Sequence, residues 1–107
     1  MKMIIAVVQD KDSNQLSNAF IEADVRATKL STTGGFLRSG NTTFMIGIDD
    51  ERVDEVLEII KQSSSKRGEY LVPPVNVEGQ AETTYPLEIE VGGATVFILP
   101  VERFLHF

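Results

Sequence analysis

The chain has 107 residues and a mass of 11.8 kDa, with 42% apolar and 24% charged residues. These values are typical of one small globular domain, so residues 1–107 are expected to form a single domain. The absence of cysteine excludes a disulfide framework and thiolate metal sites, and a single histidine, His106, argues against a histidine-based metal site or catalytic triad. We therefore expect no metal and no cofactor.

The net charge of −6 argues against general binding to nucleic acid polymers or anionic membranes. No apolar run approaches the roughly 20 residues that span a bilayer, so membrane insertion is not expected. The first eight residues lack a small-residue cleavage site and indicate a strand rather than a signal peptide, which predicts a cytoplasmic location.

The charge is unevenly distributed along the chain. Residues Val25 to Ile48 contain three basic residues and no acid, so this segment carries +3 and the remainder −9. The same segment is rich in serine, threonine and glycine, and cations, hydroxyls and flexible backbone amides together suit a small phosphate-bearing ligand. The alternative is a polar hairpin loop in which acids are missing by chance.

Alternating and helical patterns predict the elements of the first half. Met3–Val8 is a continuous apolar run typical of a buried strand, and the polar residues 9–13 after it supply helix N-cap candidates. Leu16, Ala19, Phe20 and Ala23 then share one helical face. Val25–Leu30 indicates a second strand, Ser31–Asn41 a loop, and Thr43–Ile48 a third strand.

The second half begins with a helix that Asp49, Asp50 and Glu51 open and that Ser63–Gly68 ends. Its buried face is marked by Val53, Val56, Leu57 and Ile60. Tyr70–Pro86 indicates a long loop. Leu87–Val91 predicts a strand with one wet face, Gly92-Gly93 a tight hairpin turn, and Ala94–Leu99 a last strand.

This order predicts an α+β fold, the ferredoxin-like βαββαβ sandwich, with an extra β-ribbon strand and a long loop before the last strand. Both helices would cover one face of an antiparallel sheet. The other face, half apolar, would need a partner, so we expect an oligomer.

Two segments resemble a known family. Lys29-Leu30-Ser31-Thr32-Thr33-Gly34-Gly35-Phe36-Leu37-Arg38-Ser39-Gly40-Asn41-Thr42-Thr43-Phe44 closely resembles the signature of the PII-like cyclic di-AMP receptors of Gram-positive bacteria. The tail Val91-Gly92-Gly93-Ala94-Thr95-Val96-Phe97-Ile98-Leu99-Pro100-Val101 and the start Ile4-Ile5-Ala6-Val7-Val8-Gln9-Asp10 are similar to the same family. The resemblance implies a single PII-like domain and a homotrimer that binds one cyclic di-AMP in each cleft between subunits. It also implies a signal receptor without catalytic activity, which acts through its loops on a downstream protein partner.

The phosphates are expected to contact Arg26 and Thr28. Arginine offers a planar fork that suits a phosphate diester, and Thr28 would lie on the same strand face as Arg26. The alternatives are an ion pair of Arg26 with Asp24 or with an acid on another strand, and ordinary strand propensity of Thr28. The resemblance assigns ligand contact to both residues and to Ala27 between them.

The bases are expected to contact residues in and beside the loop. Phe36 would stack on a purine; the alternative is that it packs on the protein. Asn41 would form hydrogen bonds with the edge of an adenine; the alternative is that it only forms a turn. Gly47, in mid-strand, would let a base approach the backbone, unless it marks a β-bulge. The resemblance adds Gly35 and Leu37, which would shape the loop and offer amides, and Phe97, as an apolar wall from the adjacent subunit or as a core residue.

Two other functions compete with a cyclic di-AMP receptor. The first is a PII-like sensor of another small molecule, such as ATP or a carboxylate metabolite, although three basic residues fit a two-phosphate diester better than a triphosphate. The second is a nucleotide-directed enzyme with a metal bound by acids among Asp10, Asp12, Asp49 and Asp50. Because these acids lie at predicted helix starts, capping accounts for them, and we expect no enzyme.

Overall fold

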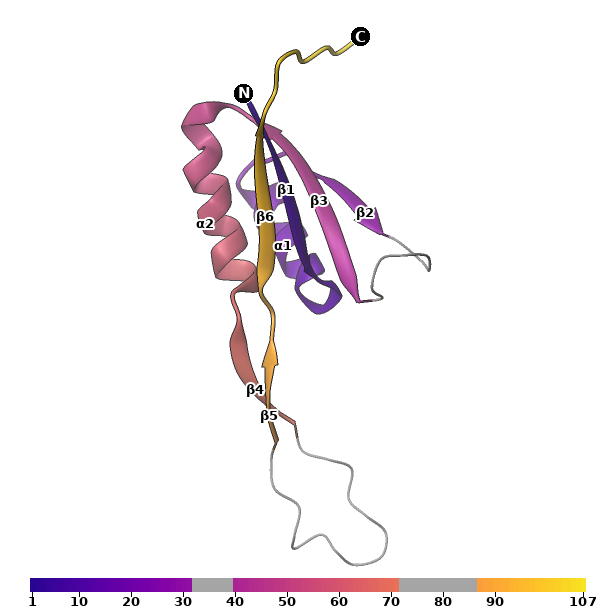
Figure 1. Ribbon diagram of the computed structural model, residues 1–107, viewed down its shortest axis with the longest axis vertical. Helices are drawn as coiled ribbons and strands as arrows, with labels where there is room; N and C mark the ends of the chain where they lie inside the picture. Colours follow the sequence, from indigo (N-terminus) through magenta and orange to yellow (C-terminus); the bar gives the residue numbers. More distant parts are fainter. Residues whose placement is uncertain (32–39, 72–86) are drawn as a thin grey trace, which may run out of the picture.

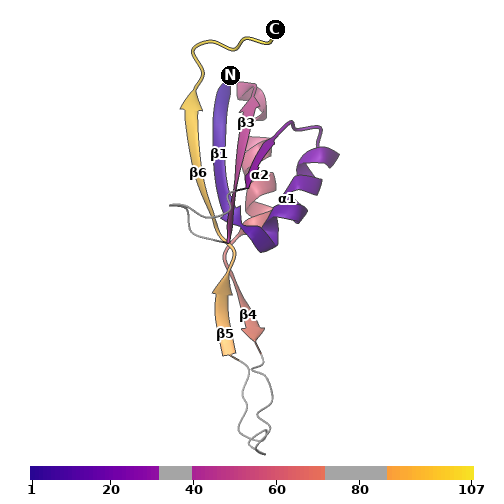
Figure 2. The ribbon, with the colours of Figure 1, turned by 90° about the vertical axis from the view of Figure 1, so that its right-hand side faces the viewer.

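The computed structural model describes residues 1–31, 40–71 and 87–107, and it has the predicted ferredoxin-like order of elements. Strands β2, β3, β1 and β6 form one antiparallel sheet in that order, and both helices cover the same face of it (Figure 2). The elements are β1 (Lys2–Gln9), α1 (Asp10–Glu22), β2 (Thr28–Ser31), β3 (Asn41–Ile48), the 3₁₀ turn η1 (Asp50–Arg52), α2 (Val53–Ser64), β4 (Arg67–Leu71), β5 (Leu87–Val91) and β6 (Ala94–Pro100).

The hydrophobic core lies between the sheet and the helices. Every second residue of β1 and β3 is buried on this side, and α1 and α2 cover them with the helical faces that the sequence predicts. The rings of Phe20 and Phe44 meet edge to face with centroids 5.6 Å apart. Across the described ranges, no helix is long and apolar enough to cross a bilayer. The fully buried residues include Ile4, Ala6, Val8, Leu16, Phe20, Phe44, Ile46 and Val56.

Among the described residues, no helix covers the opposite face of the sheet, and we call it the open face (Figure 2). The strand register places Thr28, Met45, Ile5 and Phe97 in one row across it, from β2 at one edge to β6 at the other. Phe97 is 54% exposed and Leu99, on the same strand face, 46%. The described part of the chain therefore leaves large apolar side chains on this face in contact with water, which is unfavourable for a surface of this kind.

Beyond the end of the sheet, β4 and β5 pair into a two-stranded ribbon (Figure 1). The sequence predicts β5 but not β4, since it assigns Gly68 to the helix end and Tyr70 to the start of the long loop. Those assignments are wrong, because pairing with β5 holds Arg67–Leu71 extended. The remainder of the predicted loop, residues 72–86, lies outside the described residues.

The predicted hairpin turn at Gly92-Gly93 is also wrong. β5 pairs with β4, whereas the next strand, β6, pairs with β1, so the two glycines connect two different sheets. Both have positive φ, 83° and 98°, which glycine adopts readily. A Cβ on Gly92 would lie 2.6 Å from the Ser65 carbonyl oxygen, so the site accepts no side chain.

Three elements begin two or more residues away from the predicted position. β2 begins at Thr28 rather than Val25, because the Val25 N–H bonds to the Phe20 carbonyl and the buried Val25 side chain belongs to the turn after α1. β3 begins at Asn41, which the sequence assigns to the loop, because Asn41 pairs with Gln9. The second α-helix begins at Val53, since the predicted opening at Asp49–Glu51 forms a 3₁₀ turn.

Candidate functional site

A pocket of about 360 Å³ lies at one end of the open face, where β1, β2 and β3 meet the C-terminal tail. Ligand pockets for small molecules commonly range upward from about 300 Å³, so this volume suits part of a nucleotide. Four of the predicted site residues line the pocket together, although β2 and β3 are separated in the sequence: Arg26, Ala27, Thr28 and Gly47.

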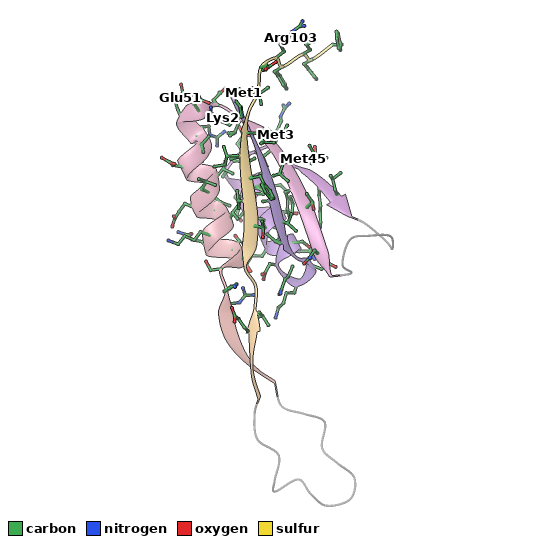
Figure 3. All side chains as sticks on the ribbon, viewed as in Figure 1. Met1, Lys2, Met3, Met45, Glu51 and Arg103 are labelled. Carbon is green, nitrogen blue, oxygen red and sulfur yellow. The ribbon has the colours of Figure 1, made fainter. Side chains whose placement is uncertain are left out.

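The pocket combines a cationic and hydroxyl wall with an apolar floor. The exposed side chains of Arg26 and Thr28 supply the wall. Met1, Met3 and Met45 supply the floor and lie together at the end of the sheet from which the tail departs (Figure 3). Methionine side chains adapt to flat apolar surfaces such as a nucleobase, and the guanidinium fits a phosphate. The sequence alone does not single out this methionine floor.

The Arg26 guanidinium makes no ion pair or hydrogen bond with the described part of the chain. The expected alternative, a pair with Asp24, is therefore not formed. Lys29 lies on the other side of β2 and donates to Asn14 Oδ1 on α1 at 3.4 Å. Of these two cations, Arg26 lines the pocket and Lys29 faces the helices; Arg38 lies outside the described residues.

Gly47 lies in a regular part of the ladder, opposite Met3 on β1, so the alternative of a β-bulge is wrong. A Cβ added to Gly47 would meet no described atom within 4 Å. Its φ is not positive, so neither steric crowding nor backbone conformation in the described structure requires glycine here. The bare backbone of Gly47 instead leaves space in the pocket wall.

The other predicted site residues lie apart from the pocket. Asn41 is on the open face of β3 but six residues before Gly47, about 20 Å along the strand. Phe97 lies on β6, three strand spacings from Thr28 in the same row, or about 14 Å. Gly35, Phe36 and Leu37 fall within residues 32–39, outside the described residues.

Two residues that line the pocket come from the segment after β6. Val101 is partly buried and Phe104 is 65% exposed, and both close the pocket from the tail side. No periodic pattern or motif marks Phe104 in the sequence, so only the spatial proximity of the tail to β2 and β3 identifies it.

Three of the four acids that the sequence assigns to helix starts lie in the first turn of α1 or η1, as the helix dipole favours, but none of the four makes a side-chain cap bond, which corrects the capping part of the interpretation. Gln9 is the N-cap of α1 and makes no side-chain cap bond. Asp10 accepts a hydrogen bond from the Thr42 hydroxyl at 2.5 Å, and Asp12 pairs with Arg67 on β4 at 2.6 Å. Asp50 lies 3.1 Å from the Met1 amino group, whose hydrogen bond and charge lower the pKa of Asp50. Asp49, the N-cap of η1, makes no side-chain cap bond either.

Comparison with known proteins places the chain in a family. The model of the cyclic-di-AMP receptor family matches residues 1–107. A crystal structure of a functionally unknown protein from Pediococcus pentosaceus ATCC 25745 is 59% identical in sequence and superimposes with a TM-score of 0.81. That match covers 99% of this chain and 96% of the other. Because the family match spans the whole sequence, this chain belongs to the cyclic-di-AMP receptor family.

Proposed function

We propose that this protein is a signal receptor, not an enzyme, that binds cyclic di-AMP in clefts between the subunits of a homotrimer in the cytoplasm. Binding reorganises the segments around residues 31–41 and 70–86 and thereby changes the surface that a downstream protein contacts. A ligand can bias such a change only through its different affinities for the two states.

The observation that carries the proposal is the convergence of Arg26, Thr28 and Gly47 on one pocket. The Arg26 guanidinium, which has no partner among the described residues, and the Thr28 hydroxyl suit a phosphate. The open space at Gly47 suits an adjoining base. Because the chain belongs to the cyclic-di-AMP receptor family, we infer that this ligand is cyclic di-AMP, which contains both phosphates and bases.

The apolar open face supports an oligomer, and the resemblance to the PII-like receptors implies that this oligomer is a homotrimer. Phe97 and Thr28 lie at opposite ends of one row, with Met45 and Ile5 between them, so a ligand in the pocket is too far from Phe97 of the same chain. Phe97 from an adjacent subunit would reach the ligand, while the apolar open face would be buried between the subunits.

Calorimetric titration with cyclic di-AMP tests the proposal directly. We expect saturable binding with one ligand per chain, and light scattering should give three times the mass of one chain. ATP should not displace cyclic di-AMP, because one arginine in the pocket matches a phosphodiester better than a triphosphate. Absence of heat and of a thermal shift far above micromolar ligand would disprove the receptor function, and displacement by ATP would favour a sensor of a different nucleotide.

Phe36→Ala should weaken cyclic di-AMP binding by roughly 1–3 kcal/mol, the loss expected when an aromatic ring no longer stacks on a base. The variant should keep the thermal stability of the parent protein, which differential scanning calorimetry measures alongside the titration. Ile21→Ala, a truncation at an exposed position of α1 on the helix side of the sheet, serves as the control for loss of apolar area. An affinity for Phe36→Ala equal to that of the control would refute the stacking role.

A further inference from the structure

The turn between α1 and β2 is clamped by an arginine from the other helical segment. Arg52, the last residue of η1, donates from Nη2 to the Ala23 carbonyl oxygen at 2.8 Å and from Nη1 to the Asp24 carbonyl oxygen at 3.3 Å. Glu55, one turn along α2, accepts from Nε at 3.0 Å and from Nη2 at 3.1 Å. One guanidinium therefore joins the end of α1 to the start of α2.

This turn needs an external donor. Ala23 follows the last residue of α1, where carbonyl groups have no partner within the helix. Asp24 has a φ of 55°, a conformation that residues other than glycine adopt at a cost. Val25 then turns back, with its N–H bonded to the Phe20 carbonyl and its side chain buried. The Arg52 clamp holds the two carbonyl groups on either side of the Asp24 N–Cα bond.

The residues directly after this turn line the pocket without support from the sheet. Pairing of β2 with β3 begins at Thr28, so Arg26 and Ala27 are bracketed by the turn on one side and the ladder on the other. The path of the backbone at Arg26 therefore depends on the direction in which the chain leaves Asp24.

From this geometry we infer that Arg52 is a positioning residue for the ligand pocket, which acts by fixing the Ala23–Asp24 turn from which Arg26 and Ala27 extend. The inference rests on the proposed function, since it assigns Arg52 a role in the affinity for cyclic di-AMP. Arg52 does not line the pocket, and its fork is occupied by Glu55 and two carbonyl groups. Its contribution is thus geometric, not a direct charge on the ligand.

The electrostatics of the clamp agree with this role. The Glu55 carboxylate raises the pKa of Arg52, and the Arg52 guanidinium lowers the pKa of Glu55, each chiefly through their hydrogen bonds. Both groups stay charged throughout the physiological range, so the clamp holds the turn independently of pH.

Arg52→Ala is the test, with Lys61→Ala as the matched control. Lys61 is an exposed cation of α2, two turns further on, so its loss changes the net charge equally without touching the turn. Arg52→Ala should weaken cyclic di-AMP binding roughly three- to tenfold, because the two carbonyl groups of the turn lose their charged hydrogen-bond donor. In ligand-free protein, amide hydrogen exchange at residues 25–28 should accelerate in Arg52→Ala and not in the control.

A double-mutant cycle with Arg26→Ala separates positioning from a general loss of stability. If Arg52 acts through the Arg26 segment, its replacement should weaken binding less in the Arg26→Ala background than in the parent. An equal loss in both backgrounds, or an affinity of Arg52→Ala equal to that of Lys61→Ala, would overturn the inference. Arg52→Lys and Glu55→Gln provide milder disruptions if Arg52→Ala fails to fold, and both should show intermediate exchange and affinity.

The two proposals fail in different ways. If the parent protein does not bind cyclic di-AMP, the proposed function is wrong, whatever the exchange data show. If the parent protein binds cyclic di-AMP but the Arg52 variants change neither the affinity nor the amide exchange at residues 25–28, the positioning role is refuted. The receptor function then stands.

Discussion

Replacement of Arg67 by alanine should lower the free energy of unfolding by about 3 kcal/mol, the lower end of the range for breaking a buried ion pair. The Asp12 side chain is only 2% exposed, and Arg67 Nη2 lies 2.6 Å from its Oδ1, while the Arg67 side chain remains 38% exposed. Removal of Arg67 leaves the Asp12 carboxylate buried without this cation, whereas removal of Asp12 leaves an arginine that water can reach. Arg67→Ala should therefore be more destabilising than Asp12→Asn.

Urea unfolding at neutral pH measures these differences. Lys66→Ala is the control, because Lys66 pairs with Glu90 at 3.5 Å between side chains that are 75% and 67% exposed. Such surface pairs contribute about 0–1 kcal/mol. The double variant Asp12→Asn/Arg67→Ala should be more stable than Arg67→Ala alone, since no buried carboxylate then remains. A stability of Arg67→Ala equal to that of Lys66→Ala would contradict the importance of the buried pair.

Gly47→Leu should reduce the affinity for cyclic di-AMP by about ten- to a hundredfold. This is the effect expected when an extra side chain in a filled space costs roughly 1–3 kcal/mol. The side chain would occupy the pocket beside Arg26 and Thr28. Because a Cβ at Gly47 meets no described atom and the backbone is ordinary strand, the fold should be retained. Gly47→Ala should lie between the parent and Gly47→Leu in affinity.

Titration of the two Gly47 variants, together with thermal unfolding, distinguishes a blocked pocket from a damaged fold. Asn18→Leu adds a leucine at an exposed position of α1, on the helix side of the sheet, and should leave affinity unchanged. If Gly47→Leu binds as tightly as Asn18→Leu, the pocket is not the binding site. If binding and unfolding temperature fall together, the glycine has a structural role that the described residues do not show.

The sequence predicts those elements whose local pattern agrees with their packing. The apolar positions of both helices recur on one face, and the runs at Met3–Val8 and Thr43–Ile48 form adjacent central strands. β4 escapes prediction because Gly68 and Glu69 have low strand propensity. Its extended form depends on pairing with β5 and on the contact between Arg67 and Asp12, which are 55 positions apart in the sequence.

The same limit applies to the site. Arg26, Thr28 and Gly47 could be selected from the sequence, because a lone acid-free segment and a mid-strand glycine are local signals. The Met3 side chain could not, since an unbroken apolar run does not reveal which alternate residues face the helices. The contact of Arg52 with the turn carries no local signal, because the two carbonyl groups that it bonds lie 28 and 29 residues earlier.

The ribbon is closed at its base by contacts that do not involve the segment between its strands. The Arg67 guanidinium bonds to Asp12, and the Gly92 N–H bonds to Gln9 Oε1 at 2.8 Å, so both ribbon strands are tied to the junction of β1 and α1. Once the ends of a loop are held together, doubling its length costs only about 0.6 kcal/mol in closure entropy. Insertions and deletions between β4 and β5 should therefore leave the four-stranded sheet intact. The two ties at the base of the ribbon thus separate the length of the chain between β4 and β5 from the stability of the sheet.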